Sequence, residues 1–101
     1  MAENSLMARL DGLVGKYEEK ELLITDPAVI ADMRRFVKLN KEYKELGALM
    51  EARGRYMQLT RQLEEAKELF ATESDADMRE MAREEIDACE TQLPALEEEI
   101  K

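Results

Sequence analysis

Apolar residues recur along this chain at alternating spacings of three and four residues, which is the period of an amphipathic α-helix. In chain order they form four stripes: Leu6, Leu10, Leu13, Tyr17 and Ile24; Phe36, Leu39, Tyr43, Leu46 and Met50; Tyr56, Leu59, Leu63, Ala66 and Phe70; and Ala82, Ile86, Cys89, Leu93, Leu96 and Ile100. The pattern predicts three main helices, over residues 5–24, residues 27–71 and the part that follows residues 72–75.

Local signals mark the ends of these helices. Pro27 suits the first turn of a helix, and Asp26 before it is a good N-cap. Ser74 with Asp77 three residues later forms a weak capping box for the third helix. Pro94 lies inside that helix, and we expect it to produce a kink because proline removes a backbone donor.

The apolar register slips by one residue between Met50 and Tyr56. Gly47 and Gly54 lie on either side of the slip. We interpret it as a bend or local irregularity in one continuous helix over residues 27–71, with a true break as the alternative.

Short connections make consecutive helices antiparallel. At ~1.5 Å per residue the three helices span about 30, 68 and 39 Å. The prediction is an all-α fold, an elongated antiparallel helical bundle or coiled coil of three main helices. We expect residues 1–101 to form one domain, and because the last stripe is still in phase at the end, a fragment of a longer protein.

Composition excludes much chemistry. There is no His and one Cys, so nucleophiles activated by His, zinc sites with His ligands and intrachain disulfides are ruled out. We expect no cofactor, no metal and no catalytic residue. No stretch is apolar enough for a membrane span, and the first residues do not form a signal peptide, so a cytoplasmic protein is expected.

Charge is unevenly distributed within the net −9. Residues 26–63 carry a net +3, whereas residues 64–101 carry a net −10. This balance argues against sequence-specific DNA binding.

A basic stripe lies within the middle part, made up of Arg34, Lys38, Lys41 and Lys44. The first three are at i, i+4 and i+7, on one helix face. Such a stripe is usually a solvated face or a partner of acidic neighbours. The alternative is contact with nucleic-acid phosphates or an acidic protein.

Methionine and cysteine are interpreted as core residues. We expect Met33, Met50, Met78 and Met81 to fill a slim core, although methionines also form adaptable binding surfaces. Cys89 lies on the apolar seam of the third helix, with no basic residue within a turn, so we expect a buried thiol whose pKa is not lowered.

Two stretches of the sequence are more informative than the overall composition. Residues 23–46 read LITDPAVIADMRRFVKLNKEYKEL, and residues 75–86 read DADMREMAREEI. They resemble the N-terminal domain of the bacterial peptide chain release factor 1 family, which typically shows an Asp-Pro helix start, a Lys-Glu-Tyr segment and a Met-Arg-Glu-Met-Ala block. The matching positions are Asp26, Pro27, Lys41, Glu42, Tyr43 and Met78 to Ala82. The sister type usually carries a Trp after the proline, and this chain has no Trp.

The resemblance implies a role in translation termination at UAA and UAG stop codons. It also implies that the domain docks on the ribosome near the stalk base and the GTPase-associated region. The family's Gly-Gly-Gln motif and codon-reading tripeptide are absent from this chain, so the resemblance implies no enzyme activity for these residues alone.

A different class of protein fits the same periodicity. A free-standing coiled-coil adaptor or oligomerisation module would show similar stripes and no ribosomal role. The natural reading frame distinguishes the two, because a release factor requires further domains that contain Gly-Gly-Gln.

Overall fold

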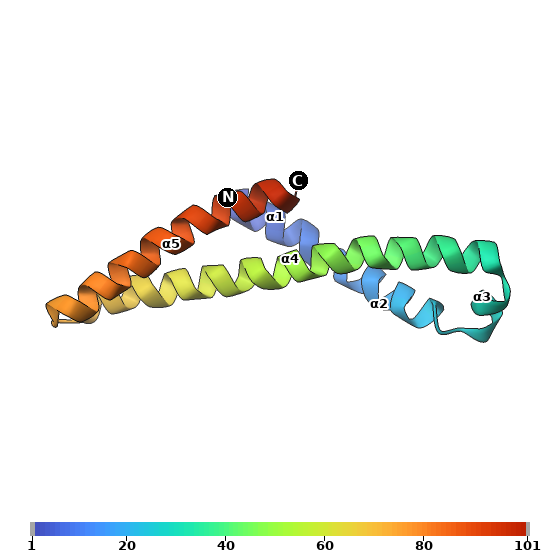
Figure 1. The fold of residues 1–101 in the computed structure, drawn as a ribbon, viewed down its shortest axis with the longest axis horizontal. Helices are drawn as coiled ribbons and strands as arrows, with labels where there is room; N and C mark the ends of the chain where they lie inside the picture. The colour runs from blue at the N-terminus through green and yellow to red at the C-terminus, as the bar shows by residue number, and fades with distance from the viewer. Residues whose placement is uncertain (1, 101) are drawn as a thin grey trace. The chain divides into compact units, whose positions relative to one another are not determined.

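Five α-helices make up the computed structural model, which describes the backbone of residues 2–100 and the side chains of residues 5–100 (Figure 1). In chain order the helices are α1 (Ala2–Asp11), α2 (Val14–Leu23), α3 (Pro27–Ala31), α4 (Met33–Thr72) and α5 (Ala76–Ile100). No strand occurs in this described part, and the predicted all-α fold class is confirmed.

The helices divide into two compact units, and the boundary falls between Arg53 and Gly54, inside α4. α4 itself is uninterrupted across this boundary, and none of the glycines has a positive φ. The prediction of a continuous helix here is therefore confirmed, and the alternative of a true break is excluded. The boundary coincides with the slip in the apolar register, because each unit buries its own stripe of α4.

In the first unit, α2 packs antiparallel to the first part of α4. Lys20 Nζ of α2 lies 3.5 Å from Glu42 Oε1 of α4. Earlier in the chain, Asp11 Oδ1 accepts a hydrogen bond from Arg53 Nε, further along α4, at 2.8 Å. The earlier residue, Asp11, thus pairs with the later residue of α4, which shows that the two segments run in opposite directions. α3 contributes Val29, which is only 1% exposed.

In the second unit, α5 packs antiparallel to the rest of α4. Tyr56 donates from its hydroxyl to Glu97 Oε2 at 3.0 Å near one end of the pair. Near the other end, Arg79 Nε donates to the Phe70 carbonyl at 3.2 Å. The buried residues of this unit follow the predicted stripes and are Tyr56, Ala66, Ala82, Cys89, Leu96 and Ile100.

The helix predicted over residues 5–24 is two helices, α1 and α2. The interruption lies at Gly12 and Leu13, where Leu13 N donates to Leu10 O at 3.1 Å, three residues back instead of four. Glycine has a poor helix propensity, which is consistent with an interruption at Gly12.

The helix predicted over residues 27–71 begins as expected but is divided after one turn. Asp26 is the N-cap, since its Oδ1 accepts from Ala28 N at 2.9 Å, and Pro27 is the first helical residue. Asp32 then adopts an extended conformation (φ −102°, ψ 95°) and its Oδ1 accepts from Arg35 N at 3.3 Å. The prediction missed this second start because it did not consider Asp32 as a cap.

The third helix starts at a different cap from the predicted one. Asp75, rather than Ser74, caps α5, because its Oδ1 accepts from Asp77 N at 3.1 Å and its carbonyl accepts from Arg79 N at 3.0 Å. α5 continues through Pro94 to its end. The kink expected there stays a prediction.

Candidate functional site

The predicted basic stripe is exposed on the surface of α4. Arg34, Lys38, Lys41 and Lys44 all face solvent, whereas Phe36, Leu39, Tyr43 and Leu46 of the same helix are half-buried. Among the described residues, none of the four cations lies within 4.0 Å of a carboxylate oxygen. The interpretation as a partner of acidic neighbours within the chain is therefore not supported.

Two exposed apolar side chains accompany these cations. Met33 is 65% exposed and Val37 is 59% exposed, and the two lie one helical turn apart. Together with Arg34, Lys38 and Lys41 they line an open groove of about 520 Å³. We call these five residues the basic–apolar face of α4. The sequence itself indicates this face, because Met33 and Val37 lie outside the spacing of the half-buried stripe that begins at Phe36.

The prediction that the methionines fill the core is wrong for three of the four named. Met33, Met78 and Met81 are 65%, 39% and 63% exposed, and only Met50 is half-buried. The buried positions are instead occupied by other residues, which include Leu10, Tyr56, Cys89 and Leu96.

Cys89 is buried as predicted, with an exposed fraction of 1%. Its Sγ lies 3.8 Å from Glu85 Oε1. Burial raises the pKa of the Cys89 thiol, and the neighbouring Glu85 carboxylate adds to this effect. The thiol is therefore held in its unreactive, protonated form.

A chain of hydroxyl groups joins α2 to α4 in the first unit. Tyr17 donates from its hydroxyl to the Tyr43 hydroxyl at 3.2 Å, which donates to Glu21 Oε2 at 3.3 Å. The hydrogen bond with Tyr17 is the main cause that raises the pKa of Tyr43 to about 12, and partial burial and the Glu21 carboxylate add to it. The apolar pattern does not predict this cluster, because Tyr43 is more than twenty residues from both Tyr17 and Glu21 in the sequence.

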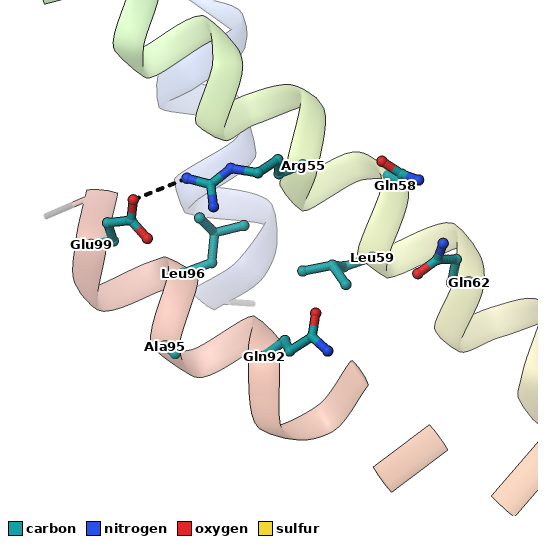
Figure 2. Close-up of a pocket in the computed structure, with 8 residues that line it drawn as sticks. All are labelled: Arg55, Gln58, Leu59, Gln62, Gln92, Ala95, Leu96 and Glu99. Atoms are coloured by element: carbon teal, nitrogen blue, oxygen red, sulfur yellow. Dashed lines mark hydrogen bonds and ion pairs between the residues drawn. The ribbon is translucent and has the colours of Figure 1, made fainter. Parts of the chain in front are cut away.

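A second groove lies in the second unit, between α4 and α5 (Figure 2). It has a volume of about 420 Å³. Leu59 and Leu96 point toward one another across it, and the ion pair between Arg55 and Glu99, at 2.9 Å, closes one end. Amide side chains complete the lining and are Gln58, Gln62 and Gln92.

Neither a metal-binding cluster nor a membrane-spanning helix occurs in the described residues. No cluster of three or more His, Cys, Asp or Glu residues in residues 2–100 could hold a metal ion. Over the same range, no helix has the length and apolar character needed to cross a membrane.

Comparison with known proteins places these features in context. A family model described as the PCRF domain matches residues 13–101. Peptide chain release factor 1 of Parabacteroides distasonis is 61% identical over 101 residues, which is 100% of this chain and 27% of that protein. The protein of the same name from Bacteroides fragilis is 63% identical over 97% of this chain and 26% of its own length.

More distant relatives carry the same name. Peptide chain release factor 1 of Flavobacterium psychrophilum is 47% identical over 95% of this chain and 27% of its own length. The chain thus spans about a quarter of the length of the curated relatives it matches. No solved structure matches it.

Proposed function

The chain belongs to the PCRF domain family, and we propose that it is the N-terminal helical domain of a longer peptide chain release factor that acts in translation termination. The observation that carries this proposal is the similarity to release factors over the whole chain. The all-α fold with its exposed helix surface supports a role in binding rather than in chemistry.

We propose more specifically that this domain docks on the ribosome, near the stalk base and the GTPase-associated region. The support is the basic–apolar face, whose three cations have no ion-pair partner among the described residues, on a chain with a net charge of −9. Positive side chains that are free of internal partners can approach ribosomal phosphates or acidic proteins in the cytoplasm.

Stop-codon reading and peptide release would belong to other parts of the full-length protein. The four glycines of this chain are never adjacent, so it contains no Gly-Gly-Gln. We propose that the full-length protein directs termination at UAA and UAG and triggers peptidyl-tRNA hydrolysis through that motif.

The test is a peptide-release assay with the full-length protein on ribosomes stalled at UAA, UAG or UGA. We expect release at UAA and UAG only, and no release when residues 1–101 are added alone. A full-length protein that is inactive at all three codons would contradict the proposed function. It would favour the adaptor alternative.

A further inference from the structure

We propose that the basic–apolar face of α4 binds an acidic amphipathic α-helix of a protein partner. This proposal rests on the proposed function, in that the partner is expected to be a protein of the ribosome. It adds the chemical class of the partner and the residues that recognise it.

The face exposes apolar side chains to solvent. Met33 and Val37 are each more than half exposed, although neither is needed to complete the buried stripe of α4. Met and Arg are enriched in the cores of protein–protein interfaces. Removing Met33 and Val37 from water lowers the free energy only if the partner offers apolar surface in return.

The charge of the face is positive and would complement an acidic partner. Arg34, Lys38 and Lys41 line the same groove as the two apolar side chains, and none of them has an ion-pair partner among the described residues. A partner with carboxylates beside its apolar stripe would pair with these cations. The partner is therefore acidic.

The helical backbone of the face favours a helix over a strand as the partner segment. The face is the side of an α-helix whose backbone groups beyond the first turn are bonded within the helix, so it does not offer a strand edge to a partner. Two apolar side chains one turn apart are instead the spacing that accepts the anchors of a second helix, at i and i+3 or i+4.

Binding to RNA fits this face less well. Interfaces with phosphate and sugar commonly include Ser, Thr, Asn, Gln or Tyr alongside Arg and Lys, and single-stranded bases stack on aromatic rings. The groove is lined by none of these additional types. Its exposed Met33 and Val37 would gain little from a phosphate backbone.

The experiment places a photo-crosslinking amino acid at position 37 of the full-length protein bound to ribosomes at a stop codon. We expect an adduct with an acidic, helical segment of a protein. Met33→Ser should lower the adduct yield, and Lys38→Glu with Lys41→Glu should lower it about tenfold. Met81→Ser, a similarly exposed methionine in the second unit, is the matched control and should leave the yield unchanged.

Three outcomes would overturn the proposal: adducts with RNA alone, adducts with a basic protein segment, or no adduct above that of a crosslinker at position 81. Peptide release by the same preparations separates this proposal from the proposed function. Normal release without the protein adduct contradicts only the acidic-helix partner, whereas loss of release from the unmodified protein contradicts the proposed function.

Discussion

Tyr17 of α2 and Tyr43 of α4 stack face to face, with ring centroids 4.9 Å apart and ring planes 10° from parallel. Offset aromatic pairs at this separation add attraction beyond the apolar area that they bury. The two residues also share a hydroxyl hydrogen bond, so this contact joins α2 to α4 through both its apolar and its polar parts.

The tyrosine contact predicts a loss of stability at alkaline pH. Well below pH 10, Tyr43 is protonated in both the folded and the unfolded chain, so its full contribution to the free energy of unfolding is present. As the pH rises from the ordinary pKa of 10.0 to the folded pKa of about 12, the unfolded chain loses the proton first, and the free energy of unfolding falls. Urea unfolding measured between pH 8 and pH 12 should show this fall.

Tyr43→Phe is the matched variant for that measurement, because it removes the hydroxyl and keeps the ring. It should be less stable than the wild type at neutral pH and should lose less stability as the pH rises. An equal alkaline loss in both proteins would show that Tyr43 is not the group responsible.

Arg79 joins the start of α5 to the end of α4 through two contacts with Phe70. Its guanidinium carbon lies 4.4 Å from the centre of the Phe70 ring, and its Nε donates to the Phe70 carbonyl. Arg79→Lys keeps the charge but loses the planar group and this donor, so we expect a loss of about 1 kcal/mol of unfolding free energy.

Arg83→Lys provides the control for this change in urea unfolding. Arg83 forms an ion pair with Glu80, at 3.5 Å on the surface of α5. The effect should stay within about 0.5 kcal/mol. Equal effects at positions 79 and 83 would argue against a special role for the contact with Phe70.

Gly47 and Gly54 are expected to be sites of stabilising substitution. Both lie in regular helix, and an added Cβ would meet only the Tyr17 ring at 3.6 Å for Gly47 and nothing within 4 Å for Gly54. Gly47→Ala and Gly54→Ala should each raise the free energy of unfolding by about 0.5–1 kcal/mol, because alanine loses less backbone entropy on folding. Thermal unfolding followed by circular dichroism tests this, and a lower midpoint for either variant would contradict it.

The exposed cations of α4 are expected to accelerate docking rather than to take part in chemistry. Reversing Arg34, Lys38 and Lys41 to Glu in the full-length protein should slow association with stop-codon ribosomes, most clearly at low salt. Peptide release at saturating protein should stay near the wild-type rate. Stopped-flow binding over a salt series measures both the rate and its salt dependence.

A control with the same net charge separates a local effect from a general one. Lys16, Arg61 and Lys67 are also exposed, and their reversal to Glu produces the same change in total charge. If both triple variants slow association equally, the stripe on α4 is an ordinary solvated face.

The sequence predicted the helices well where apolar periodicity and a proline cap agreed. The seam from Ala82 to Ile100 and the cap at Asp26 are both confirmed. It failed where a local hydrogen bond competes with periodicity, as at Asp32, whose side chain starts α4 anew. Periodicity continues through such an interruption, so the pattern alone does not reveal it.

The surface was harder to predict than the core. The basic residues of α4 were recognised from their spacing. Met33 was assigned to the core because methionine side chains usually pack in the apolar interior. The contact between Tyr17 and Tyr43 depends on how α2 lies along α4, and helix spacing within one segment carries no information about that register.

Cys89 gives the molecule a built-in reporter of opening. It is the single thiol in the sequence, and in the folded second unit it is almost inaccessible to solvent. A thiol-specific reagent can therefore label the protein only when α5 and α4 separate, so the labelling rate follows how often that separation occurs. Labelling of residues 1–101 therefore measures the opening of this helix pair without an introduced cysteine.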